Sequence, residues 1–367
     1  MTHAGPSAPP YRFYAAEISY FSAKVRPALR YKGIHYLEVM PDYRGVILPR
    51  TGMAFIPIVV TPEDETWQDT SDILDALERR VPTPPLYPTT PAQRLAAYVL
   101  ELYADEFMIL PAMHYRWSFE ESVTKARADF ASASPDPAGA ARFAEKMKGT
   151  RPFLGITDET IPAIEGHLAD LLAALSAHFA QHPYLLGGRP SLADCALMGP
   201  LYAHLYLDAV PGRLLRATAP EVGRWIERMN RPDPDARGEW LPDDALAPTL
   251  LPILALVGRD AVPLILAGAR AFDDWVDEQP SPPDELPRGV GAHATALRGI
   301  PMQRFTSAYT PWMVQRALDA QRALDDAGRA AVARAFAGTG CETLLTHVPR
   351  HRVGKRQFKL VLERSAA

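Results

Sequence analysis

The segment that most constrains this chain is the apolar run 55–60, which a single proline interrupts at Pro57. Proline has no backbone N–H, so it belongs at the start, edge or exposed end of a strand. After a polar turn, Asp69-Thr70 opens a helical run whose free N–H groups form a site for a carboxylate. If the Ile56-Pro57 bond is cis, the turn directs the Ile56 backbone outward. Together these features predict a docking site for a small peptide; the alternative is an ordinary strand end and an ordinary helix cap.

The residues before this run have the pattern of a small α/β domain. Residues 12–15 predict a strand, residues 23–31 a helix that ends at Gly33, and residues 35–39 a second strand. With the proline-containing strand and the helix that follows the polar turn, strands and helices alternate through the first 80 residues.

In this order of elements the chain resembles the glutathione transferase superfamily, whose first domain is thioredoxin-like. The matching segments occur in the family's order and at near-family spacing, at residues 19–29, 32–34, 55–58 and 69–78. Farther along, residues 184–196 resemble the buried helix start of the family's all-helical second domain, where Ser191 and Asp194 have the spacing of a capping box. The resemblance covers roughly residues 10–231 and implies a thioredoxin-like α/β domain followed by an all-α domain.

The predicted organisation has five parts. They are a disordered segment 1–10, a glutathione-binding domain 11–81, a proline-rich linker 82–90, an all-helical domain 91–231 and an extension 232–367 packed on the helical domain. The extension is expected to be mostly helical, with a long helix over 310–337. Near its end, residues 343–348 and 357–362 predict two strands of a terminal hairpin around a basic turn, 349–356.

Composition and charge exclude several functional classes. The chain has 367 residues, 47% of them hydrophobic, which is enough for two or three domains with a core. No apolar run approaches the ~18 residues of a membrane span, and residues 1–10 lack the basic flank and apolar core of a secretory signal. We therefore expect a cytoplasmic protein without a membrane partner. A net charge of −4 argues against a nucleic-acid partner, and the basic turn is expected to be solvated.

Cysteine usage argues against redox catalysis. The only cysteines are Cys195, expected to be buried, and Cys341, so a disulfide framework is excluded. Family branches that exchange thiols place a cysteine near the position of Ser19, and the first domain here has none. His114 stands near two carboxylates, but nothing fixes their geometry, so no metal site is predicted.

The resemblance points to chemistry on a bound thiol. Glutathione is mostly protonated at neutral pH, because a free thiol has a pKa near ~8.5. A hydroxyl that donates to the sulfur near a helix N-terminus favours the thiolate. The resemblance assigns this role to Ser19, just before a helix that we expect to start around Ser22, which resembles its N-cap. Tyr14 is the competing catalytic hydroxyl, and Tyr20 replaces the proline that often follows the family's serine.

The resemblance also assigns the glutathione contacts. The strand end at Ile56-Pro57 would bind the cysteinyl backbone through Ile56. Asp69 would form an ion pair with the γ-glutamyl ammonium group, and Thr70 with the helix start would bind the γ-glutamyl carboxylate. Phe55 stands where many members of the family have a lysine. A ligand other than glutathione therefore stays open.

The acceptor pocket is expected at the start of the second domain. Residues 92–113 predict one long helix, which in the family lines the cleft facing the thiol. Tyr103, Glu106 and Trp117 are therefore the candidates for shaping this pocket. The alternative is that residues 114–117 pack in the core and at a dimer interface.

The resemblance thus implies a homodimeric glutathione transferase that detoxifies a hydrophobic, electrophilic small molecule, with glutathione as co-substrate and no metal. Two alternatives remain. A glutathione-dependent isomerase or ether-cleaving enzyme would use the same thiolate. A non-catalytic binding or assembly protein would use the fold alone, and Phe55 and Tyr20 favour that alternative.

Overall fold

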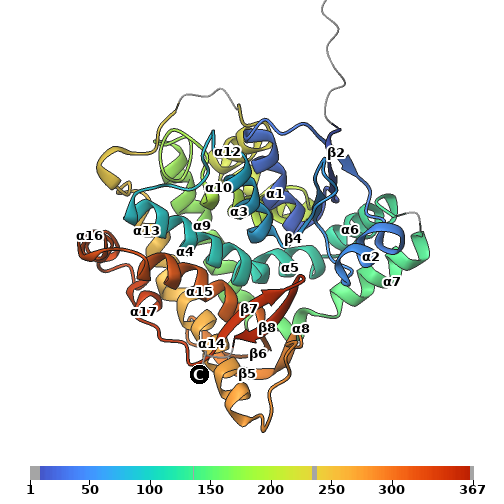
Figure 1. Cartoon of the computed structure of the whole chain (residues 1–367). Helices are drawn as coiled ribbons and strands as arrows, with labels where there is room; N and C mark the ends of the chain where they lie inside the picture. The colour runs from blue at the N-terminus through green and yellow to red at the C-terminus, as the bar shows by residue number, and fades with distance from the viewer. Residues whose placement is uncertain (1–8, 135, 234–237, 364–367) are drawn as a thin grey trace, which may run out of the picture.

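The computed structural model describes residues 9–134, 136–233 and 238–363 (Figure 1). The segment 1–10 that the sequence predicts to be disordered lies almost wholly outside these residues. Three parts follow one another along the chain: a sheet with helices, a set of helices, and an extension that contains helices and two hairpins.

The first part is the thioredoxin-like α/β domain. Its elements are β1 (Tyr11–Tyr14), α1 (Tyr20–Tyr31), β2 (Tyr36–Val39), the π-helical turn η1 (Tyr43–Ile47), α2 (Leu48–Thr51), β3 (Ile58–Val60), β4 (Thr66–Gln68) and α3 (Thr70–Arg80). The sheet order is β2-β1-β3-β4, with β1 parallel to β2 and the other pairs antiparallel. Phe13 and Val59 pack with α1 and α3, whereas Tyr14 and Ile58 pack with Ile47. Strand β4 was expected as part of a polar turn.

The second part is all-helical. Its elements are α4 (Pro91–Glu106), α5 (Ile109–Trp117), α6 (Glu120–Ser132), α7 (Pro137–Lys148), α8 (Arg151–Leu154), α9 (Ile161–Phe179), α10 (Leu192–Pro200), η2 (Leu201–Tyr206), α11 (Ala209–Thr218) and α12 (Pro220–Asn230). The prediction of one helix over 92–113 is wrong, because the chain breaks between α4 and α5. Pro111 explains the break: it has no N–H for the carbonyl of Phe107, four residues earlier.

The start of α10 confirms the capping box. Ser191 and Asp194 satisfy each other's backbone N–H groups, with Asp194 Oδ2 2.9 Å from Ser191 N. The other carboxylate oxygen accepts from Leu185 N and from Trp225 Nε1, both at 3.0 Å. The buried carboxylate of Asp194 therefore joins α10 to α12 and to the loop that precedes α10.

The extension contains helices, two hairpins and short helical turns. Its elements are η3 (Pro242–Asp244), α13 (Leu251–Leu256), η4 (Val257–Ala261), α14 (Val262–Glu278), β5 (Gly289–Leu297), β6 (Ile300–Ser307), α15 (Tyr309–Arg322), α16 (Asp326–Phe336), α17 (Glu342–Leu345), β7 (Arg352–Arg356) and β8 (Lys359–Glu363). The hairpin β5–β6 was not predicted. The expected helix 310–337 is two helices, because Asp325 caps α16 by accepting from Gly328 N at 2.8 Å.

The terminal hairpin exists, and its strand β8 overlaps the predicted strand 357–362, but the predicted first strand and turn are wrong. Residues 343–348 were expected as a strand and instead contribute to α17, while most of the predicted basic turn forms β7. The true turn lies at Gln357 and Phe358, whose φ values of 46° and 71° are those of a two-residue primed hairpin turn. The turn residues lack glycine and asparagine, so the sequence carried no turn signal there.

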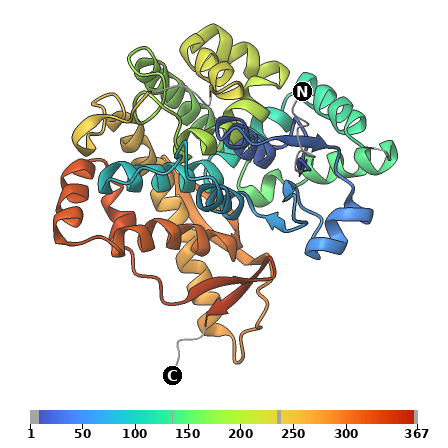
Figure 2. The same cartoon turned by 45° about the horizontal axis from the view of Figure 1, so that its top comes forward.

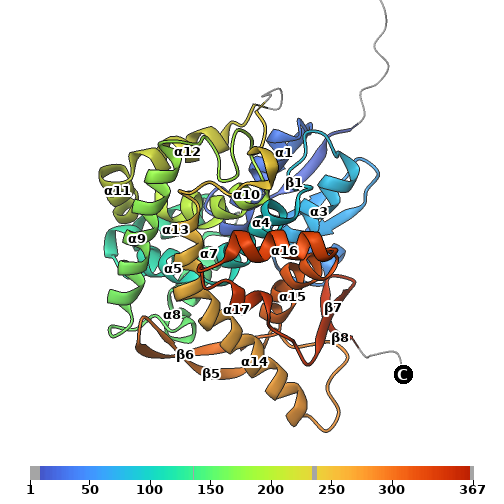
Figure 3. The ribbon, with the colours of Figure 1, turned by 90° about the vertical axis from the view of Figure 1, so that its left-hand side faces the viewer.

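The extension packs on both preceding parts of the chain. Helices α15 and α16 lie along α4 (Figures 2 and 3), and α13 lies against α9. One hydrophobic core is continuous from Phe13 of the sheet through the helical domain to Leu345 of α17. The extension also touches the first domain directly, through Arg316 with Asp75 at 2.7 Å.

One stretch of the extension, Leu251–Glu278, is long and apolar enough to cross a membrane by length and composition alone. Of its most apolar window, 67% is buried against the rest of the protein. Burial of this kind is typical of a core helix. Helix α14 packs against β5 and β6 (Figure 1).

Candidate functional site

The sheet register brings the predicted site segments to one end of the sheet. Tyr14 of β1 pairs with Ile58 of β3, which pairs with Gln68 of β4. The loop after β1, the turn before β3 and the turn after β4 therefore emerge side by side. These three segments carry Ser19, Ile56 and Asp69.

Ser19 is the N-cap of α1. Its backbone is extended, and its Oγ accepts a hydrogen bond from Ser22 N at 3.3 Å. The helix therefore begins at Tyr20, and the prediction that Ser22 caps it is wrong; Ser22 is buried and its Oγ accepts from Ala16 N at 3.4 Å. The half-buried Ser19 hydroxyl keeps its own proton free to donate at the positive end of a 12-residue helix.

The two tyrosines near Ser19 have different surroundings. Tyr14 is buried with Ile47 and Ile58 on one face of the sheet. Tyr20 is buried between the domains, and its hydroxyl donates to the carbonyl of Ala104 on α4 at 2.5 Å. Replacement of the family's proline by Tyr20 thus adds a hydrogen bond between α1 and α4.

The strand end before β3 leaves a backbone edge open. The Ile56-Pro57 peptide bond is cis, and among the described residues neither the N–H nor the C=O of Ile56 has a hydrogen-bond partner. An extended peptide can pair with such an edge through its main chain. Phe55 next to it is exposed, and the guanidinium of Arg288 from the extension lies 4.0 Å from the centre of its ring.

Asp69 caps α3 from an unusual backbone conformation, with φ 73° and ψ 129°. Its Oδ1 accepts from Ser71 N at 3.0 Å, and its Oδ2 lies 3.1 Å from Lys355 Nζ of β7. The hydroxyl of Tyr309, on α15, also helps to lower the pKa of this carboxylate. Burial would raise the pKa of Asp69, but the charge of Lys355 outweighs it and lowers the pKa. Thr70, the first residue of α3, is buried beside it.

Two of the three predicted pocket residues lie in the core. Tyr103 is fully buried and shares a 2.5 Å hydrogen bond with His167 Nε2. Trp117 is 1% exposed and stacks on Phe130. The placement of these two side chains gives no support to their predicted role in an acceptor pocket.

Glu106, the third of them, lies where α4 meets the extension. Its carboxylate accepts from Thr310 Oγ1 at 2.5 Å, and its backbone carbonyl accepts from Arg304 Nη2 at 3.3 Å. Burial raises the pKa of Glu106. The extension therefore supplies the immediate polar neighbours of both Glu106 and Asp69.

A buried ionic cluster that was not predicted from the sequence lies beside the site. Lys24 Nζ lies 2.8 Å from Glu101, 2.6 Å from Asp105 and 3.1 Å from the hydroxyl of Ser71. Arg316 of the extension reaches Glu101 at 3.2 Å. The cluster joins α1, α3, α4 and α15. The four-residue spacing of Glu101 and Asp105 on one helix face, opposite a lysine within an apolar helix, was the available signal.

Burial and charge set the protonation of this cluster. Burial would raise the pKa of Glu101, but Arg316 and Lys24 lower it to about 2. Burial together with the charge of Glu101 raises the pKa of Asp105 to about 7, against the attraction of Lys24. The Oδ1 of Asp105 is buried without a hydrogen-bond partner. Asp105 is thus the titrating member of the cluster near neutral pH.

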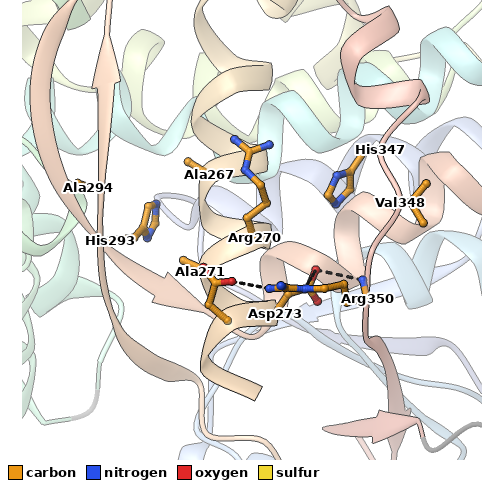
Figure 4. A pocket seen from close by; sticks show the side chains of 10 residues that line it. Ala267, Arg270, Ala271, Asp273, His293, Ala294, His347, Val348 and Arg350 are labelled. Carbon is orange, nitrogen blue, oxygen red and sulfur yellow. Dashed lines mark hydrogen bonds and ion pairs between the residues drawn. The ribbon is translucent and has the colours of Figure 1, made fainter. Parts of the chain in front are cut away.

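The two cysteines are buried, and burial raises the pKa of both thiols, that of Cys341 to about 12. Within the described residues, no group of three or more His, Cys, Asp or Glu side chains could hold a metal ion. A surface cavity of about 590 Å³ lies in the extension, where Arg270 of α14 stands between His293 and His347 (Figure 4). Its lining contains none of the predicted site residues.

Two family models match this chain. Residues 13–85 match "Glutathione S-transferase, N-terminal domain", and residues 158–228 match "Glutathione S-transferase, C-terminal domain". The chain belongs to the glutathione S-transferase superfamily. Neither match reaches the extension, and no curated protein sequence matches the chain significantly.

Solved structures with a similar arrangement include three bacterial proteins. The β-etherase LigF from Sphingobium sp. strain SYK-6 is 16% identical and has a TM-score of 0.45, over 60% of this chain and 95% of its own. A glutathione S-transferase from Methylobacterium radiotolerans, in complex with glutathione sulfonate, is 24% identical with a TM-score of 0.38, over 61% and 92%. FzlA from C. crescentus is 18% identical with a TM-score of 0.41, over 67% and 92%. Likenesses at this level transfer no reaction to the present chain.

Proposed function

We propose that this protein is a glutathione-dependent transferase that joins the glutathione sulfur to an electrophilic small molecule. The observation that carries the proposal is the register of the sheet. It brings a free helix-cap hydroxyl at Ser19, an unpaired backbone edge at Ile56 and a helix start at Asp69 to one end of the domain. These are a donor for sulfur, an edge for a peptide and an N-terminus for a carboxylate.

In this proposal the chain's own residues bind and orient the tripeptide. The N–H and C=O of Ile56 pair with the cysteinyl main chain, and the first turn of α3 at Thr70 receives the γ-glutamyl carboxylate. The Ser19 hydroxyl donates to the sulfur, which favours the thiolate once the thiol proton has left to solvent. The thiolate forms a bond to the electrophilic carbon, and the leaving group departs with the electron pair of the bond that breaks.

The test of this proposal is the ionisation of bound glutathione. The Ser19→Ala variant should keep its glutathione affinity in calorimetry. The pKa of the bound thiol, followed by the ultraviolet absorbance of the thiolate, should rise by about 1 to 2, because a hydrogen bond to a charged group contributes about 1.5–3 kcal/mol. Ser19→Thr keeps both the hydroxyl and the helix cap and should restore the wild-type value.

Tyr14→Phe is the matched comparison, since it removes the competing hydroxyl from the same end of the sheet. It should leave the pKa of the thiol unchanged. A larger effect of Tyr14→Phe than of Ser19→Ala would move the role to Tyr14. Absence of glutathione binding to the wild type would refute the proposal.

A second candidate, a non-catalytic binding protein, is favoured by one observation. Lys355 of the extension already contacts the carboxylate of Asp69. Turnover of a generic electrophile such as 1-chloro-2,4-dinitrobenzene separates the two candidates. Glutathione binding without a lowered thiol pKa and without turnover would favour the non-catalytic one.

A further inference from the structure

We propose that Lys355 competes with the ammonium group of the ligand for the carboxylate of Asp69. In this way Lys355 sets how strongly the site recognises a free α-amino group. The inference rests on the proposed function and on the role that the family resemblance gives to Asp69, which is to bind the γ-glutamyl ammonium group. It assigns to the extension a part in ligand selection.

Both carboxylate oxygens of Asp69 already have a partner within the chain. One carboxylate oxygen accepts from Ser71 N at 3.0 Å, and the other lies 3.1 Å from Lys355 Nζ. An incoming ammonium group would therefore meet an oxygen that the ammonium group of Lys355 already contacts.

Strand β7, which carries Lys355, is held in a defined position. Strand β7 is fixed to α15 by a pair of hydrogen bonds, because Gln315 donates to the carbonyl of Val353 and accepts from its N–H, both at 2.9 Å. Val353 is buried, and Lys355 follows two residues later on the same face of the strand. The lysine therefore reaches α3 from a strand with a defined position.

Lys355 has other partners that it can keep when it releases Asp69. Its Nζ lies closer to Asp72, at 2.7 Å, than to Asp69, and it stands 3.3 Å from the centre of the Trp312 ring. It can release Asp69 and keep both of these partners, which favours exchange over a permanent block.

The charge balance of the cluster also favours this exchange. Two carboxylates, Asp69 and Asp72, share the single ammonium group of Lys355. Burial, and then the negative charge of Asp69, raise the pKa of Asp72 against the attraction of Lys355. An ammonium group at Asp69 would relieve this excess of negative charge.

The test is a cycle of two proteins and two ligands, measured by calorimetry. The proteins are the full-length wild type and Lys355→Met, and the ligands are glutathione and N-glutaryl-cysteinylglycine, which is glutathione without its α-amino group. Lys359→Met is the matched control, because Lys359 lies on the same hairpin and pairs with the exposed Glu285. Lys355→Gln is measured alongside in case Lys355→Met does not fold.

The expected result is a selective gain. Lys355→Met should raise the affinity for glutathione by about tenfold, the scale of one charge-assisted hydrogen bond, and leave that for the deaminated ligand nearly unchanged. Lys359→Met should behave as the wild type does.

An equal gain for both ligands would overturn the inference, since it would show that the hairpin blocks the whole tripeptide. An unchanged or weaker affinity for glutathione would overturn it too, and in both cases glutathione binding itself would leave the proposed function standing. If no protein binds either ligand, both the inference and the proposed function are refuted.

Discussion

Lys24 and Lys355 each lie between two carboxylates, and both contact residues at the start of α3. Lys24 lies inside the protein, with its side chain and those of Glu101 and Asp105 at 0–1% exposure. Its partners come from α4, so the cluster forms part of the contact between the first and second domains. A charge in such surroundings has no access to water and depends entirely on its protein partners.

Lys355 has the same kind of partners in a wetter place. Its side chain is 14% exposed, and the side chains of Asp69 and Asp72 are 20% and 41% exposed. Water can replace any partner that leaves, so breaking one contact costs little. The comparison teaches that burial, and not the identity of the charged residues, decides whether such a cluster holds domains together or can exchange a partner for a ligand.

The largest expected effect is that of removing the buried lysine. Lys24→Met should lower the free energy of unfolding by about 3–5 kcal/mol, because it leaves the buried Asp105 without its ammonium partner and Glu101 with Arg316 alone. Chemical denaturation measures the loss. The control is Lys125→Met, which removes a partly exposed lysine paired with Asp129 and should cost less than about 1 kcal/mol. Equal losses in the two variants would erase the distinction between buried and exposed pairs.

The next effect is a pH dependence that only the buried cluster should show. The pKa of Asp105 is about 7 in the folded protein, above the value of about 3.9 expected in the unfolded chain. The folded state therefore holds an extra proton between about pH 4 and about pH 7, and the free energy of unfolding falls as pH rises through this window.

Asp105→Asn should remove this fall, which is on the order of a few kcal/mol. The measurement is chemical denaturation at both ends of the window. Asp129→Asn, at a partly exposed carboxylate paired with Lys125, is the control and should keep the wild-type slope. An Asp105→Asn variant with the full wild-type slope would show that other groups produce it.

A smaller effect, on glutathione binding, should come from the partly exposed cluster of Lys355, Asp69 and Asp72. Asp69→Asn keeps an oxygen to cap α3 and removes the charge that holds an ammonium group. In the wild type it should weaken glutathione binding by less than about threefold, since Lys355 loses the same partner. In the Lys355→Met background it should weaken binding by about tenfold. Identical factors in the two backgrounds would show that Lys355 and the ligand do not compete.

The smallest expected effect is that of Lys355→Met on stability. We expect a change below about 1 kcal/mol in the free energy of unfolding, because the carboxylates that it leaves behind can reach water. Thermal unfolding beside Lys24→Met gives the direct comparison. A loss near that of Lys24→Met would make Lys355 a structural residue.

The sequence carried the parts of the site that depend on near neighbours. Pro57 marked the strand end, Ser191 and Asp194 marked a helix start three residues apart, and Asp69 marked the cap of α3. Such signals are readable because the residues that satisfy one another lie within a few positions. The same reasoning erred by a few residues at Ser22, because a serine on either side of the first turn can cap a helix.

The sequence did not carry the parts that depend on distant contacts. The first strand of the terminal hairpin was predicted nine residues before its true start at Arg352, since the turn at Gln357 and Phe358 has none of the usual turn residues. Tyr103 and Trp117 were assigned to a pocket and lie in the core. Periodicity shows which face of a helix is apolar, but not which element covers it.

The sequence by itself determined the superfamily, the α/β and all-helical parts, and the helix start and strand end that would bind a peptide. Only the tertiary structure decided which residues of the extension reach this site, among them Lys355 at Asp69 and Arg288 at Phe55. Lys355 and Asp72 are 283 positions apart, and Arg316 and Asp75 are 241. No local propensity links residues at such separations, because their contact arises only when the shared hydrophobic core has assembled around α4.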